Sequence, residues 1–177
     1  SSDLQGRVYI YDIAGAIKQS QSLGANSVAV NAMNVIVMTG DVTNNNATAN
    51  SIADVTGLTF PVTAGQTYWF EFVIPYTSAA TTTGSRWSIN GPGSPTLLAY
   101  RSEYTLTATT TTVNSANTYD TPSASNASSL AAGNVATIWG LITPSSNGSV
   151  TARFASEISS SAIVAKAGAT LRWIRVI

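Results

Sequence analysis

Few side chains in this sequence are able to perform acid–base or nucleophilic chemistry. The 177 residues include no histidine and no cysteine, and only eight aspartates and glutamates. Histidine is the commonest general base, and a Ser-His-Asp triad requires it. Without cysteine, thiolate catalysis, zinc–sulfur sites and disulfides are excluded. Carboxylates, lysines and hydroxyl groups are the only catalytic groups that remain.

These remaining groups do not fall into a catalytic motif. The lysines Lys18 and Lys166 are preceded, three positions earlier, by Gly15 and Ile163, so no S-x-x-K nucleophile exists. Gly91-Pro92-Gly93 is not a phosphate-binding loop, because proline removes a backbone donor and no lysine follows. The carboxylates are scattered, without a pair placed for glycoside hydrolysis. We expect a protein that is not an enzyme and that has no cofactor.

One polar segment has the beginning of a calcium-binding loop. Asp41, Thr43 and Asn45 have the spacing of the first ligands in an EF-hand, but the required glycine and the distal glutamate are missing. The segment 41–50 consists of residues that favour turns. We therefore interpret it as a solvated turn and predict no metal site.

A long segment without regular patterning follows the middle of the chain. Residues 114–134 are small and polar, and a loop of this length in a compact domain is often exposed or functional. The alternative is a loop that only covers the surface. If the loop recognises a ligand, the candidate residues are Tyr119, Asp120 and Asn126.

Composition excludes two classes of partner. Charged residues make up 9% of the chain, against about a quarter in ordinary globular proteins. The formal net charge is zero, so no electrostatic surface for nucleic acid or an anionic membrane is expected. No apolar run approaches the 18 or so residues that a membrane-spanning helix needs. We predict neither nucleic-acid nor membrane binding.

The stretch 57–92 must form the centre of the fold. It contains a run in which every second residue is large and apolar: Tyr68, Phe70, Phe72, Ile74 and Tyr76. Alternate side chains of a strand point to opposite faces, so these five residues form one apolar stripe. The opposite face carries Trp69, Glu71 and Val73, and it is too apolar for a surface that only meets water. We expect this second face to be partly covered.

The rest of the chain also reads as short strands between turns. Residues 14–23 are the exception, and we interpret them as one or two turns of helix or as a plain connector. The pattern predicts an all-β protein, an antiparallel β-sandwich. The main expected strands lie at residues 7–13, 35–38, 98–106, 135–142, 150–158 and 171–177.

Part of the sequence resembles a known family. The pattern F-P-V-x-A-G-x-x-Y-x-F at residues 60–70, the loop at 76–84 and R-W-S-I-N-G-P at 86–92 are similar to a domain of tailed-bacteriophage structural proteins. Such domains resemble the trimeric jelly roll of the TNF/C1q type. The resemblance covers about residues 50–177. It implies a jelly roll at 51–177, preceded by an N-terminal arm and first strands at 1–50 that contact the capsid or another partner.

Several strands are apolar on both faces and need cover on both sides. These are residues 35–38, 135–142 and 171–177. The sandwich core covers one side; a three-fold partner, as the resemblance implies, or the N-terminal segment would cover the other. The candidate subunit-interface residues are Trp69, Glu71, Val73, Arg101, Glu103, Trp139 and Trp173.

Together these observations predict a structural protein on the exterior of a phage virion. In this reading a homotrimer decorates or cements the capsid, and its partner is the major capsid protein. The alternative is a fibre or needle tip that recognises a host-surface receptor, such as a glycan stacked on tryptophan rings. Residues 1–50 show no heptads of the kind that a fibre shaft would continue. Decoration is therefore the preferred prediction.

Overall fold

The computed structural model describes residues 7–11, 17–22, 33–121, 127–128 and 130–176. The chain divides into two compact units, Ser1–Asn31 and Ala32–Ile177. The division therefore lies well before residue 50, and the strands between residues 34 and 44 belong to the second unit.

The first unit contains a small antiparallel sheet. Strands β1 (Arg7–Tyr11) and β2 (Ile17–Ser22) pair from Arg7↔Ser22 to Tyr11↔Ile17. The segment that we expected to be a helical turn or a connector is thus a strand for most of its length. Its only apolar anchors, Ile17 and Leu23, are too few to define a helix face, whereas pairing with β1 satisfies its backbone.

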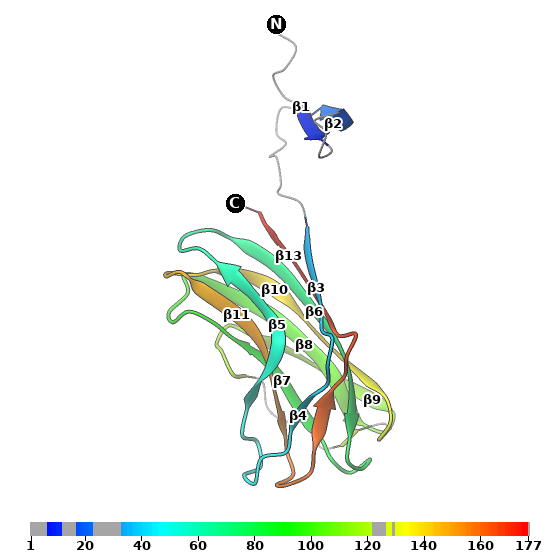
Figure 1. Cartoon of the computed structure of the whole chain (residues 1–177). Helices are drawn as coiled ribbons and strands as arrows, with labels where there is room; N and C mark the ends of the chain where they lie inside the picture. The colour runs from blue at the N-terminus through cyan, green and yellow to red at the C-terminus, as the bar shows by residue number, and fades with distance from the viewer. Residues whose placement is uncertain (1–6, 12–16, 23–32, 122–126, 129, 177) are drawn as a thin grey trace, which may run out of the picture. The chain divides into compact units, whose positions relative to one another are not determined.

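The second unit is a sandwich of two antiparallel sheets, so the predicted fold class is confirmed (Figure 1). The smaller sheet has the order β5 (Ala53–Val62), β11 (Gly148–Ser156) and β7 (Ser85–Asn90). The larger sheet has the order β3 (Asn34–Val37), β13 (Thr170–Arg175), β6 (Tyr68–Ser78), β10 (Asn134–Thr143), β8 (Leu97–Thr107) and β9 (Thr110–Ala116). Two short strands, β4 (Val42–Asn44) and β12 (Ile163–Ala165), extend it beside β6. The TNF-like jelly roll stays a prediction.

The core lies between the two sheets, and β6 is at its centre. The inner side chains Phe70, Phe72, Ile74 and Tyr76 are fully buried, as the alternation predicted. Phe60 of the opposite sheet packs on Phe70 at 5.9 Å between ring centroids. Each fully buried aromatic or aliphatic side chain of this kind contributes about 1.5–3 kcal/mol by leaving water. The inner face of β6 therefore accounts for much of the stability of the unit.

Proline in the middle of β6 is accommodated by a gap between its neighbours. A proline cannot donate to a ladder, so it is unusual in a central strand. On one side, β13 pairs with β6 only as far as Val73, and β12 begins its pairing at Tyr76. Pro75 lies between these two partners, where its carbonyl accepts a hydrogen bond from Lys166 N–H at 2.9 Å. The break between β12 and β13 thus removes the need for a donor at this position.

Two expectations about strands require correction. Strand β11 ends at Ser156, and Ile158 is 44% exposed rather than facing inward with Phe154. The long loop begins later than residue 114, because β9 continues through Ala116 and pairs with β8. Local alternation does not report where a ladder ends, since that depends on the partner strand.

Candidate functional site: the outer face of the larger sheet

The outer face of the larger sheet is formed by the residues that alternate with the core. On β6 these are Trp69, Glu71 and Val73, all partly exposed. Strand pairing places each of them in a row with residues of the neighbouring strands, since partners in register share a face. The three rows together define the surface that we call the outer face.

The first row is apolar. Trp69 is in register with Leu141 on one side and with Ile174 on the other, and Leu141 is in register with Ala99. Leu141 is 38% exposed. The row thus runs across four strands, from β13 to β8, without a charged side chain.

The second row alternates between charge and aromatic surface. Arg172 forms an ion pair with Glu71, which is in register with Trp139. Trp139 is in register with Arg101, whose guanidinium carbon lies 5.6 Å from the centre of the indole ring. Such a cation–π contact contributes about 0.5–1 kcal/mol at an exposed site. No carboxylate pairs with Arg101 among the residues that the structure describes.

The third row joins valine, threonine and one carboxylate. Val73 is in register with Thr170 and Thr137, and Thr137 with Glu103. Glu103 is in register with Val113 on β9. Across the second and third rows, two guanidinium groups and two carboxylates therefore lie on the same face.

The outer face exposes more apolar surface than a solvent face requires. The large apolar residues exposed there are Val35 at 55%, Val37 at 55%, Leu97 at 41%, Val113 at 47%, Val135 at 54%, Trp139 at 40% and Leu141 at 38%. Exposed apolar residues gathered on one face of a sheet form a candidate interaction surface. The strands predicted to need cover on both sides are covered on the inner side alone by the described part of the chain.

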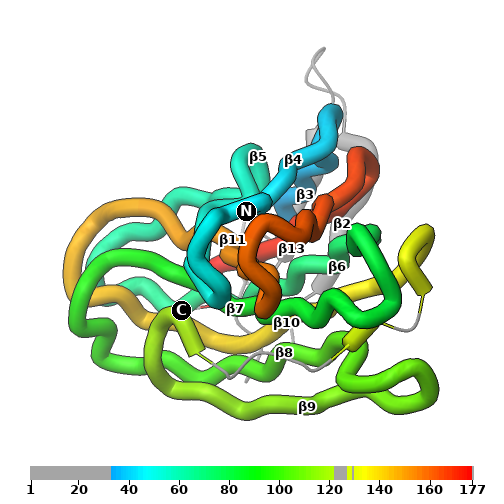
Figure 2. Tube along the Cα trace, turned by 90° about the horizontal axis from the view of Figure 1, so that it is seen from below, coloured from blue at the N-terminus to red at the C-terminus, as the bar shows by residue number. Residues whose placement is uncertain are grey.

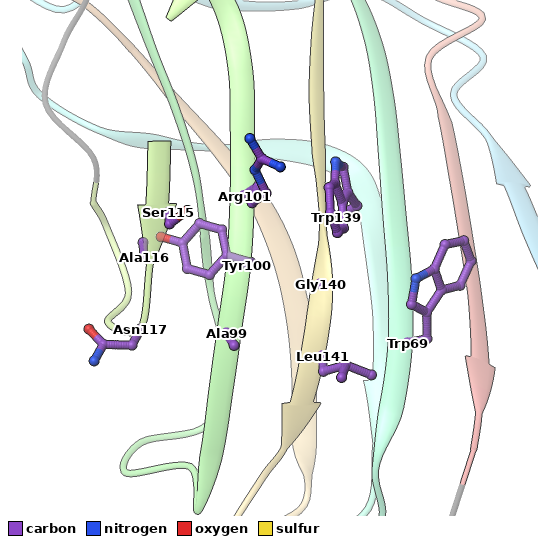
Figure 3. Close-up of a pocket in the computed structure, with 10 residues that line it drawn as sticks. All are labelled: Trp69, Ala99, Tyr100, Arg101, Ser115, Ala116, Asn117, Trp139, Gly140 and Leu141. Atoms are coloured by element: carbon purple, nitrogen blue, oxygen red, sulfur yellow. The ribbon is translucent and has the colours of Figure 1, made fainter. Parts of the chain in front are cut away.

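A hollow of about 670 Å³ lies on this face, between β9 and β6 (Figure 3). Arg101, Trp139 and Trp69 project from three adjacent strands along it, and Ser115 and Asn117 supply its polar side. Ala99 contributes only a methyl group, which leaves room between Leu141 and β9. The hollow combines indole rings with a guanidinium group, an amide and a hydroxyl.

Six of the seven predicted interface residues come together on the outer face; Trp173 does not. Trp173 is in register with Phe70 and points inward, where its ring stacks on Phe60 at 5.4 Å between centroids. The alternation of β13 already contained this signal, because Leu171 and Trp173 share a face. Sequence reasoning missed Arg172 and Ile174, which that same alternation places on the outer face.

The candidate recognition residues Tyr119 and Asp120 both make contacts within the chain, and their role in recognition stays a prediction. The Tyr119 hydroxyl donates to the carbonyl of Pro92 at 2.9 Å, and the ring packs against the core. Asp120 accepts two hydrogen bonds of 2.7 Å from Arg153, which also contacts Asp54 at 2.8 Å. The Asp120 N–H donates to Ile89 at 3.1 Å on the free edge of β7. Asn126 lies outside the described residues.

No metal centre is found in the described part of the chain. No group of three or more acidic side chains lies close enough to hold a metal ion there. Asp41, the first residue of the calcium-like spacing, forms an ion pair with Lys166 and accepts a hydrogen bond from Ala167 N–H at 2.8 Å. The hydrogen bond from Lys166 lowers the pKa of Asp41. No helix of the described chain is long and apolar enough to cross a membrane.

No family model and no curated protein sequence matches the chain. Among solved structures it is similar to infectious bursal disease virus of the Gx strain, with a TM-score of 0.27 and 11% identity over 94% of this chain and 43% of that chain. The Gt strain gives a TM-score of 0.26 and 11% identity over 100% of this chain and 50% of that chain. The chain spans at most half the length of either protein. At such TM-scores the likeness carries no argument about fold or function.

Proposed function

We propose that the protein is a non-enzymatic structural protein that assembles with itself through the outer face and belongs to the exterior of a virion. The observation that carries the proposal is the exposed apolar surface of Val35, Val37, Val135, Trp139 and Leu141. Burial of such surface against a second copy is favourable by about 25 cal/mol per Å² of apolar area, less the cost of ordering.

The charges on the outer face also favour a copy of the same chain as the partner. Arg101 and Arg172 are balanced by Glu71 and Glu103. The chain as a whole has no net charge, so copies do not repel one another at long range. A strongly charged partner would find no complementary field here.

The resemblance of residues 57–92 supplies the number of copies and the setting. It implies a homotrimer on a tailed phage that decorates or cements the capsid, with the major capsid protein as its partner. The absence of histidine, cysteine and a carboxylate motif supports a structural role over a catalytic one.

The test is the mass of the purified protein in solution by light scattering. We expect three times the chain mass of 18.3 kDa for the unmodified protein. Trp139→Glu places a charge in the centre of the outer face and should give the mass of a single chain. Ile158→Glu is the matched control, because Ile158 is similarly exposed, at 44%, and follows β11 of the other sheet. A single-chain mass for the unmodified protein would overturn the proposal.

Capsid binding tests the virion setting separately. The unmodified protein should bind emptied capsids of its own phage at saturable sites. A trimer that ignores capsids and adheres to host cells would favour the alternative, a receptor-binding tip.

The hollow beside Trp139 is the observation that favours this alternative. Its indole rings offer stacking surfaces, and Arg101, Ser115 and Asn117 offer hydrogen bonds to a glycan. Both readings use the same surface, so a glycan that binds there should compete with assembly. Titration of oligosaccharides into the unmodified protein, measured by calorimetry, tests this alternative: heat of binding that is lost in Trp139→Glu would support a glycan site in the hollow, and no heat of binding would leave assembly as the function of the surface.

A further inference from the structure

The free edges of the two sheets differ in how they are protected. A free edge presents unpaired backbone groups, and proteins shorten it, cover it, or place proline and charge on it. Strand β7 is covered by the segment at Asp120, whose N–H bonds to Ile89. Strand β5 contains Pro61 and a positive φ of 96° at Gly57. At the other end of the larger sheet, β3 has four residues and β4 has three.

Strand β9 has none of these protections in the described part of the chain. It is seven residues long, with the sequence TTTVNSA, and it contains neither proline nor a charged residue. Figure 2 shows it as the outermost strand of the larger sheet, beyond β8. On its other side no described residue hydrogen-bonds to its backbone. Among the residues that the structure describes, an edge of about 23 Å is therefore open.

The side chains of β9 are suited to pairing with a second β9. The strand is nearly symmetric about Val113: in an antiparallel arrangement Val113 lies opposite Val113, and Thr111 lies opposite Ser115. Threonine–serine and β-branched pairs across strands are each favourable by about 0.2–1 kcal/mol. Because the strand is uncharged, a two-fold pairing brings no like charges together.

We propose that β9 is a docking edge for β9 of a second copy. The two strands pair in antiparallel fashion about a two-fold axis at Val113 and join two larger sheets into one continuous sheet. An interface of this kind is isologous, so each copy uses the same residues. The inference goes beyond the proposed function and does not rest on it, because backbone pairing along β9 is a different contact from burial of the outer face, although the Val113 side chain belongs to both surfaces.

The test places a charge at the centre of β9 and measures self-association by sedimentation velocity over a range of protein concentrations. The basic particle, whether trimer or single chain, should double in mass as the concentration rises. Val113→Lys and Val113→Glu should each weaken the doubling by at least about tenfold, since each places like charges opposite one another. A mixture of the two variants should restore it. Val113→Thr, which keeps a β-branched side chain of similar size, should double as the unmodified protein does.

Cross-linking provides a second measurement if a charged variant fails to fold. The chain has no cysteine, so Val113→Cys has one possible disulfide, to its own copy. Paired antiparallel residues are close enough for this bond. Mild oxidation should give a covalent dimer for Val113→Cys and not for the equally exposed control Ile158→Cys. The inference is overturned if neither doubling nor cross-linking occurs, or if mixing the charged variants restores nothing.

A failure of the proposed trimer can be distinguished from a failure of the edge pairing. Trp139→Glu should change the mass of the basic particle and leave its doubling intact. Val113→Lys should remove the doubling whatever the mass of the basic particle, since the Val113 side chain also lies on the outer face. A basic particle of one chain that still doubles would overturn the proposed trimer and leave the edge pairing standing.

Discussion

The two faces of β6 show how one strand divides its apolar residues between different partners. Phe70, Phe72 and Ile74 face the smaller sheet and are fully buried. Trp69 and Val73, their neighbours in sequence, face outward and are only partly covered. Both faces carry large apolar side chains, yet one completes a core within the chain and the other does not. Apolar content alone therefore does not say whether a residue supports folding or assembly; its face does.

The largest effect should come from a pair of neighbouring truncations on β6. Phe72→Ala leaves a cavity between the sheets and should reduce the free energy of unfolding by about 3–5 kcal/mol. Val73→Ala, one position further, should cost less than about 1 kcal/mol, because Val73 is partly exposed. Denaturant titration at one fixed protein concentration measures both. Equal losses would show that the two faces do not differ as described.

A smaller loss of stability is expected at Gly140 of β10, where the inner face leaves no room for a side chain. A Cβ at Gly140 would lie 2.3 Å from the carbonyl oxygen of Ala99 and 2.6 Å from Cα of Tyr100. Gly140→Ala should thus force β10 away from β8 and cost about 1–3 kcal/mol of unfolding free energy. The matched control is Gly133→Ala, since a Cβ there has nothing within 4 Å. Thermal unfolding compares the two; a harmless Gly140→Ala would contradict the close pairing of these strands.

The smallest effect concerns the carboxylates. Glu71 is paired with Arg172 on the outer face. Glu157 instead lies beside Gly84 and accepts a hydrogen bond of 3.3 Å from the Gly84 N–H. Burial raises the pKa of Glu157 above its ordinary value of 4.5. The folded state then holds the proton more tightly than the unfolded state, so this group makes the protein less stable as the pH rises through and above 4.5.

Glu157→Gln removes this pH dependence and keeps an oxygen for the hydrogen bond to Gly84. The difference in unfolding free energy between the variant and the unmodified protein should shift in favour of the variant from pH 4 to pH 7. This shift should be smaller than the effects of Phe72→Ala and Gly140→Ala. The measurement is the denaturant midpoint at both pH values. A gain that is larger at pH 4 would contradict the direction of the shift.

The alternation of β6 was sufficient to predict much of the outer face from the sequence. It separated Trp69, Glu71 and Val73 from the core, and the same reasoning placed Arg101 and Glu103 on a shared face. It failed for Trp173, because a large apolar residue was assigned by type and not by its position relative to Leu171.

The long-range contacts were not predictable in this way. Nothing near Asp120 in the sequence indicates that it bonds to Arg153, and nothing near Tyr119 indicates a bond to Pro92. A polar segment with one aromatic residue has the same local pattern whether it is exposed or fixed to a sheet. Such contacts depend on which strands become neighbours, and no period-two pattern contains that information.

The position of β13 has a consequence for synthesis of the protein. This strand lies between β3 and β6 in the larger sheet, although residues 170–175 are synthesised after every other strand of this unit that the structure describes. Until then Leu171 is missing beside Phe72, and β3 has no partner. In a nascent chain, the position between β3 and β6 therefore stays empty until β13 has been synthesised. The apolar residues on both sides of this position stay uncovered until then. Folding of this unit should therefore finish only after β13 has been synthesised, and the long sequence separation between β3 and β13 should make it slow.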